Sequence, residues 1–138
     1  MSEILVDTSV WLDFFRDRDS PYGIALDRLL QEERVCTTGL ITAEIIPGAR
    51  TLKHYRALKD YFQAIPRVDA PATLWDDVME TQFRLKRKGV NGMSIPDLII
   101  AVVALAADRA VFTKDHDFTL IRRVLPLRVV EVTASTGG

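Results

Sequence analysis

The chain has little of what would place it outside the cell or in a membrane. It has one cysteine, which cannot form an intrachain disulfide and so favours a reducing compartment. The longest apolar run, residues 98–107, is about half of the ~20 residues that a transmembrane helix requires. No secretory leader pattern follows Met1, because acidic and polar residues come early. We therefore expect a cytoplasmic protein with no membrane association.

Charge of one sign is not in excess either. Lys and Arg number 18 against 19 Asp and Glu, which gives a net charge of −1. A near-neutral surface attracts phosphates weakly, which argues against binding of nucleic acid over the whole surface. No Walker A or GxGxxG loop is present, so the sequence offers no support for a nucleotide-dependent enzyme. Any chemistry on nucleic acid must therefore be local.

Length and composition indicate one globular domain. The 138 residues are 48% hydrophobic and 27% charged, without repeats or a linker-like stretch. We assign residues 2–132 to a single domain. Residues 133–138 are small and mostly polar, and we expect them to form a flexible C-terminal tail.

Short β-type runs alternate with helical patterns along the chain. The expected strands are residues 4–6, 35–38, 66–68, 110–113 and 129–132. This alternation predicts the α/β class, with a parallel sheet of about five strands in a three-layer α/β/α arrangement. Functional sites in such sheets form at the carboxyl ends of the strands.

Local signals predict where several helices begin and end. Ser94, with Asp97 three residues later, predicts the start of an apolar and buried helix. Gly89 predicts the end of a long helix that begins near Thr73. Trp11 and Trp75 lie on apolar helical faces, so we expect them in the core.

Four acidic residues stand where this architecture can bring them together. Asp7 follows the first strand, Asp115 follows residues 110–113, and Asp97 lies in the first turn of the buried helix. Glu44 stands among apolar residues, where an unpaired carboxylate is unfavourable.

Simpler interpretations exist for three of these positions. Asp7 and Asp97 are residue types that cap helices, and either Asp115 or Asp117 suits the cap of a helix near Phe118.

Carboxylates gathered at one place require protonation or a counter-ion, since two of them at 4 Å repel by about 4 kcal/mol at an effective dielectric of 20. Oxygen ligands without nearby His or Cys favour Mg²⁺ or Mn²⁺ over zinc. Such an ion lowers the pKa of a bound water and stabilises charge on a phosphoryl oxygen. The acidic set therefore predicts metal-dependent phosphodiester hydrolysis.

Two basic clusters recur on helical segments, one at residues 50–59 and one at residues 84–88. Each cluster has two interpretations: a helical face exposed to solvent, or a contact with the phosphates of a substrate. The candidates for such contacts are Arg50, Lys53, Arg84 and Lys86.

Four motifs occur in order along the chain: ILVDTSVW at residues 4–11, ITAEII at 41–46, DLIIA at 97–101 and TKDHDF at 113–118. Together they resemble those of PIN-domain ribonucleases and, within that family, the VapC toxins of toxin–antitoxin pairs. The similarity extends from Ile4 to about Val132. It implies a PIN-like fold and Mg²⁺- or Mn²⁺-dependent endonucleolytic cleavage of RNA.

The resemblance also implies roles for individual residues. The catalytic set would be Asp7, Glu44, Asp97 and Asp115, with Asp117 as the alternative to Asp115. Asp7 and Asp97 would be the principal metal ligands, and Glu44 and Asp115 would complete the coordination directly or through water.

The same resemblance implies supporting residues and partners. Ser9 and Thr113 would support the site through hydrogen bonds. The partners would be an RNA substrate, a small VapB-like antitoxin and a second copy of the chain.

The main alternative is a PIN-like domain that binds RNA or a protein without cleaving it. Retention of the whole acidic set argues against that alternative. A phosphoacceptor signalling domain also clusters acids in a small α/β fold, but it would place the acceptor Asp after a later strand and a Lys near the end.

Overall fold

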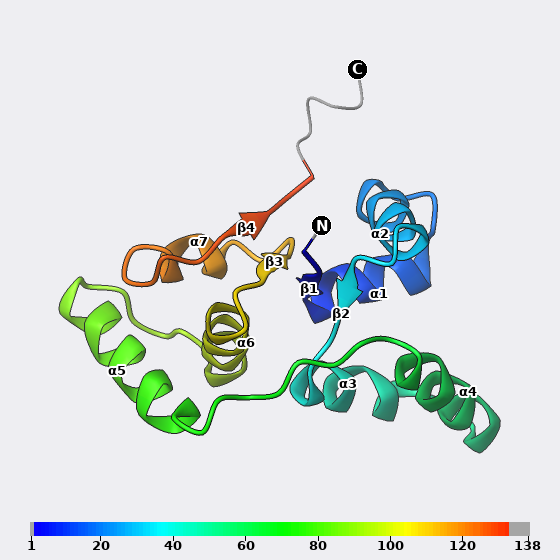
Figure 1. Cartoon of the computed structure of the whole chain (residues 1–138), viewed down its shortest axis with the longest axis horizontal. Helices are drawn as coiled ribbons and strands as arrows, with labels where there is room; N and C mark the ends of the chain where they lie inside the picture. Colours follow the sequence, from blue (N-terminus) through cyan, green and yellow to red (C-terminus); the bar gives the residue numbers. More distant parts are fainter. Residues whose placement is uncertain (1, 133–138) are drawn as a thin grey trace.

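The sheet is built from four short parallel strands in the order β2-β1-β3-β4. The computed structural model describes residues 2–132, so the predicted tail at 133–138 lies outside the described residues (Figure 1). The strands are β1 (Ile4–Val6), β2 (Val35–Cys36), β3 (Ala110–Phe112) and β4 (Val129–Val130). The central strand β1 is wholly buried, as expected for a strand with neighbours on both sides and helices above and below.

The expected strand at residues 66–68, the third of five along the chain, is not formed. The segment makes one isolated parallel bridge, between Thr37 and Arg67. Thr37 donates its N–H to the Pro66 carbonyl and accepts from the Val68 N–H, both at 2.8 Å. Proline has no N–H to extend the ladder. The estimate of about five strands was therefore too high by one.

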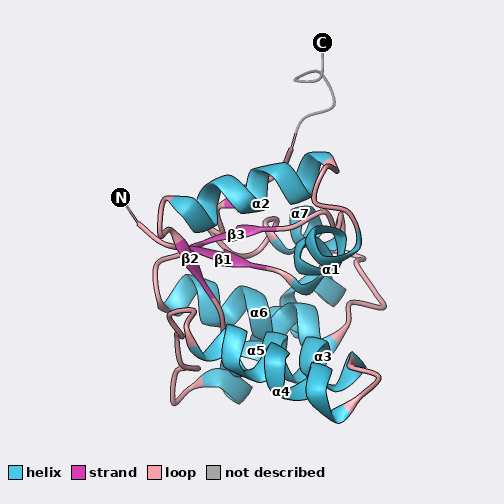
Figure 2. Cartoon of the chain, turned by 90° about the vertical axis from the view of Figure 1, so that its right-hand side faces the viewer, coloured by secondary structure: helices cyan, strands magenta, loops and turns pink. Residues whose placement is uncertain are grey.

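Helices cover both faces of the sheet, which confirms the three-layer α/β/α prediction (Figure 2). One face carries α2, and the other is covered by α6 with α5 and α3 beside it. The helices are α1 (Thr8–Arg16), α2 (Pro21–Gln31), α3 (Gly39–Ile45), α4 (Leu52–Gln63), α5 (Leu74–Arg87), α6 (Ile95–Ala106) and α7 (Asp117–Ile121), with a 3₁₀ turn, η1 (Ile46–Gly48), after α3. None of the helices within residues 2–132 is long and apolar enough to cross a membrane.

The ends of α5 and α6 form as their sequences predict. Gly89 takes a φ of +81° after α5, and its N–H donates to the Lys86 carbonyl. The Val90 N–H donates to the Leu85 carbonyl, which completes a Schellman motif. At the start of α6, Ser94 Oγ accepts the Asp97 N–H at 3.3 Å. This cap places Asp97 in the first turn of a largely buried helix.

The two tryptophans behave differently. Trp11 is fully buried in an aromatic cluster with Phe14 and Phe62, as predicted. Trp75 is 61% exposed, so its predicted place in the core was wrong. The apolar face that carries Trp75 points away from the chain's own core.

Candidate metal centre

Asp7 lies where β1 ends and α1 begins, and it is 5% exposed. Its main chain serves the fold, because its N–H donates to the Phe112 carbonyl at 2.9 Å and its carbonyl accepts from Val10 and Trp11. Its side chain makes no capping hydrogen bond. The simpler interpretation of Asp7 as a side-chain cap is therefore wrong, and its carboxylate is available for another role.

Two hydroxyl groups orient that carboxylate. Asp7 Oδ2 accepts hydrogen bonds from Ser9 Oγ at 2.7 Å and from Thr113 Oγ1 at 2.9 Å. Thr113, just after β3, is fully buried. Asp7 Oδ1 has no hydrogen-bond donor among residues 2–132. One oxygen is thus fixed by the protein, and the other is free to bind a ligand.

Three further carboxylates gather beside this point. Asp97 from α6, Asp115 from the loop after β3 and Asp117 from the start of α7 each offer an oxygen within 4.8 Å of the others. The Asp115 N–H donates to Thr113 Oγ1, and the Asp117 N–H donates to Asp115 Oδ1, both at 2.9 Å. The structure therefore brings both candidates for the last acidic position into one cluster.

The electrostatics of the cluster disfavour ionisation of Asp97. Burial, together with the nearby carboxylates of Asp115, Asp7 and Asp117, raises the pKa of Asp97 from 3.8 to about 6. A hydrogen bond with Ser94 offsets part of this rise. A divalent cation would reverse the balance, since it stabilises the ionised form of every carboxylate around it.

Glu44 lies outside the cluster of three acids. Its apolar neighbours Ile41 and Ile45 are buried, but Glu44 is on the exposed face of α3. Glu44 is therefore not the buried, unfavourable carboxylate that its apolar neighbours in sequence predict. Glu44 Oε1 accepts a hydrogen bond of 2.8 Å from Thr8 Oγ1. Because Thr8 follows Asp7 in the chain, this bond ties Glu44 to the neighbour of Asp7.

The donor set fits a hard cation. The cluster offers carboxylate oxygens alone. Asp7 lies close enough to raise the pKa of Asp97, and its Oδ1 is a further carboxylate oxygen beside the cluster. All-oxygen sites of this kind suit Mg²⁺ and Mn²⁺ better than zinc.

The four basic candidates are exposed and lie on other elements. Lys53 is on α4, Arg50 precedes it, and Arg84 and Lys86 are on α5. None of the four forms a salt bridge within the described part of the chain. The basic end of α5 is separated from the start of α6 by a short loop, and Gln82 on α5 donates to the Met93 carbonyl in that loop.

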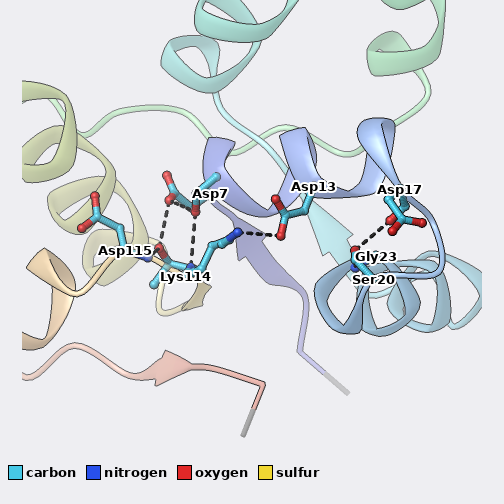
Figure 3. Close-up of polar contacts among 9 residues, drawn as sticks. Asp7, Asp13, Asp17, Ser20, Gly23, Lys114 and Asp115 are labelled. Atoms are coloured by element: carbon cyan, nitrogen blue, oxygen red, sulfur yellow. Dashed lines mark hydrogen bonds and ion pairs between the residues drawn. The ribbon is translucent and has the colours of Figure 1, made fainter. Parts of the chain in front are cut away.

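Sequence reasoning missed three residues around the centre. The first is Thr8, whose hydroxyl donates to Glu44. Lys114 lies inside the TKD motif, and its ammonium contacts Asp13 at 2.7 Å (Figure 3). Two sequence features could have pointed to this pair. Lys114 lies between two predicted site residues, Thr113 and Asp115. Asp13 is four residues after Ser9, so the two share one face of α1.

The model of the PIN domain family matches residues 4–124 of this chain. Ribonuclease VapC21 of Mycobacterium tuberculosis is 33% identical over 101 residues, which are 72% of this chain and 73% of that protein. Ribonuclease VapC11 of the same organism is 29% identical over 128 residues, 91% of this chain and 96% of that protein.

A solved structure of VapBC2 from Rickettsia felis, bound to a promoter DNA fragment, has the same fold with a TM-score of 0.74. It is 18% identical and covers 94% of this chain and 98% of that chain. VapBC from Salmonella typhimurium, also bound to DNA, gives a TM-score of 0.73 at 18% identity, with 96% of this chain and 100% of that one covered. The solved structures agree with the sequence matches in fold. On the family model and the 33% identical relative, the chain belongs to the PIN domain family and, within it, to the VapC ribonucleases.

Proposed function

We propose that the protein is the toxin of a toxin–antitoxin pair and cleaves RNA endonucleolytically with Mg²⁺ or Mn²⁺. The observation that carries the proposal is the cluster of Asp97, Asp115 and Asp117 beside an Asp7 with one free oxygen. The names of the curated relatives, which are ribonucleases, support the same activity. An RNA substrate implies action in the cytoplasm.

We assign the metal ligands to Asp7 and Asp97, with Asp115 or Asp117 completing the set. When bound, the ion would supply a water of lowered pKa and stabilise charge on a phosphoryl oxygen. Ser9 and Thr113 hold Asp7 Oδ2 by hydrogen bonds, so Oδ1 is the oxygen that would bind the ion. Glu44, fixed by Thr8, is the candidate to reach the centre through a water.

We assign the contacts with the RNA backbone to Arg50, Lys53, Arg84 and Lys86. All four are exposed. Only a short loop separates the basic end of α5 from the start of α6, where Asp97 lies, so RNA bound at that end would extend toward the acidic cluster. Each lost phosphate contact should lower the slope of log affinity against log salt by about 1. Filter binding of RNA by Arg84→Ala at several salt concentrations, with the divalent ion replaced by EDTA, measures this slope.

We propose a small antitoxin as the inhibitory partner. The structural neighbours are VapBC complexes, which supports such a partner. A groove of about 520 Å³ between α3 and α4 suits an amphipathic acidic segment, because its apolar wall includes Ile46, Phe62 and Ile65 and its rim carries Lys59 and Arg67. Arg67→Glu should weaken the complex that the chain forms with its antitoxin, measured by co-purification after co-expression.

We propose that a second copy of the chain covers α5. Trp75, Met79 and Phe83 are 61%, 60% and 63% exposed, and their spacing of four residues puts them on one face. A twofold axis pairs the two α5 helices antiparallel. The acidic first turn of one helix, with Asp76, then meets the basic last turn of the other, with Arg87.

The activity itself is tested with purified protein and a structured RNA. The proposal expects cleavage with Mn²⁺ or Mg²⁺, no cleavage in excess EDTA, and loss of cleavage in Asp97→Asn. A domain that binds RNA without cleaving it would retain RNA binding and show no metal-dependent product.

A further inference from the structure

The segment that follows β3 is held against α1 by its backbone and by one hydroxyl group. Thr113 donates to Asp7, the Lys114 N–H donates to Ser9 Oγ at 3.3 Å, and the Asp115 N–H donates to Thr113. The orientation of Asp7 and Asp115 therefore depends on the contact between residues 113–115 and α1.

The side chain of Lys114 makes a second contact with the same helix. Its Nζ lies 2.7 Å from Asp13 Oδ2 (Figure 3). Ser9 and Asp13 are four residues apart on α1, so they share one face of that helix. Lys114 thus holds α1 at two points, with its main chain on Ser9 and its ammonium on Asp13.

The surroundings of this ion pair limit its contact with water. The side chain of Asp13 is 17% exposed and that of Lys114 is 40% exposed. The ammonium lies 5.6 Å from the centre of the Tyr22 ring on α2, and Tyr22 stacks on Phe112 of β3. A partly buried pair over an aromatic ring is screened less than a pair in open solvent.

We propose that Lys114 and Asp13 are a positioning pair for the metal centre. The pair holds residues 113–115 against α1, so that Asp7 and Asp115 present their carboxylates to the ion. Neither residue belongs to the cluster of carboxylates, so both act through their neighbours. The inference rests on the metal site proposed above and extends it to residues that do not touch the ion.

The direction in which Mn²⁺ affinity changes when Lys114 loses its charge distinguishes a positioning role from a purely electrostatic one. Removal of the Lys114 ammonium leaves the region more negative, which by Coulomb attraction alone would tighten the binding of a divalent cation. Loss of positioning would weaken binding instead. Lys114→Met therefore distinguishes the two explanations, whereas Asp13→Asn weakens binding in both.

The test is a calorimetric titration of Mn²⁺ into the full chain, at a temperature where circular dichroism shows each variant folded. Lys114→Met and Asp13→Asn should each bind Mn²⁺ about 10-fold more weakly, as is typical when residues that orient metal ligands are lost. Exchange of the two charges, Lys114→Asp with Asp13→Lys, should recover most of the affinity. Asp108→Asn is the matched control, because it removes a carboxylate from an exposed ion pair before β3.

The outcomes distinguish this inference from the proposed function. Unchanged or tighter Mn²⁺ binding by Lys114→Met, while Asp97→Asn loses binding, overturns the positioning pair and leaves the metal site intact. Failure of the charge exchange to recover affinity also contradicts the pairing. If wild type shows neither heat nor a Tm shift with Mn²⁺, the metal site and this inference both fail.

Discussion

Thr113 Oγ1 donates a hydrogen bond of 2.9 Å to Asp7 Oδ2, and this contact joins the carboxyl ends of β3 and β1. The same oxygen of Thr113 accepts the Asp115 N–H. One buried hydroxyl group thereby orients two of the acids at the centre.

Replacement of Thr113 by valine should therefore destabilise the fold. The shape is kept, but the Asp115 N–H loses its acceptor and Asp7 loses a donor. The expected loss is about 1–3 kcal/mol in the free energy of unfolding, measured by urea denaturation in EDTA. Thr113→Ser keeps the hydroxyl and should lose less. Equal stability of the valine variant and wild type would show that the hydroxyl does not hold these groups.

Asp97 should make the stability of the metal-free protein depend on pH. Its pKa in the folded protein is about 6, above the ordinary value of 3.8. The stability that the protonated form contributes is therefore complete below about pH 3.8 and is lost as the pH rises through 6. Asp97→Asn removes this loss, so it should gain about 1–2 kcal/mol on wild type between pH 4 and 7, after a discount for partial exposure. A stability difference that stays flat over this range would contradict the account.

Divalent ions should stabilise the folded protein through the same carboxylates. Mn²⁺ at a hundred times its Kd should add about 2.7 kcal/mol to the free energy of unfolding. Thermal unfolding with and without Mn²⁺ measures the shift in Tm. Asp97→Asn should lose most of the shift, and Asp108→Asn should keep it. An equal shift in both variants would place the ion elsewhere.

The exposed face of α5 should govern the oligomeric state. Met79→Glu puts a charge in the middle of the apolar stripe and should convert a dimer to a monomer in sedimentation velocity. Ile24→Glu is the control, because Ile24 is a similarly exposed apolar residue on α2. A wild type that stays monomeric at micromolar concentrations, or a Met79→Glu variant that still dimerises, would rule out this interface.

Gly23 should not tolerate a side chain, although it is remote from the acidic cluster. A Cβ there would lie 2.6 Å from the Asp17 carbonyl oxygen and 2.8 Å from Ser20 Oγ. These groups form the turn between α1 and α2 (Figure 3). Gly23→Ala should cost about 1–3 kcal/mol in chemical denaturation. Gly39→Ala meets no atom within 4 Å and should leave stability near wild type.

Much of the fold follows from local sequence. The apolar runs of β1 and β3, the Ser94 cap and the Gly89 terminus are each specified by a few neighbouring residues. Since parallel strands end at one edge of the sheet, the approach of Asp7 to the segment after β3 could be inferred as well.

Other features depend on contacts that local patterns do not encode. The face of α5 with Trp75 has the same periodicity whether it packs inside the chain or against a second copy. Glu44 has apolar neighbours in sequence, but on a helix these point in other directions. The Lys114–Asp13 pair joins a loop to a helix, so only the folded chain reveals it.

Single-turnover cleavage of an end-labelled RNA by wild type and Asp7→Asn, purified identically, decides whether the acidic cluster is a nuclease centre. We expect products with wild type and Mn²⁺, none in EDTA, and a rate at least 100-fold lower for Asp7→Asn with Mn²⁺, which corresponds to about 2.7 kcal/mol in the barrier. Cleavage by wild type that persists in EDTA, or equal rates for the two proteins, would contradict this expectation.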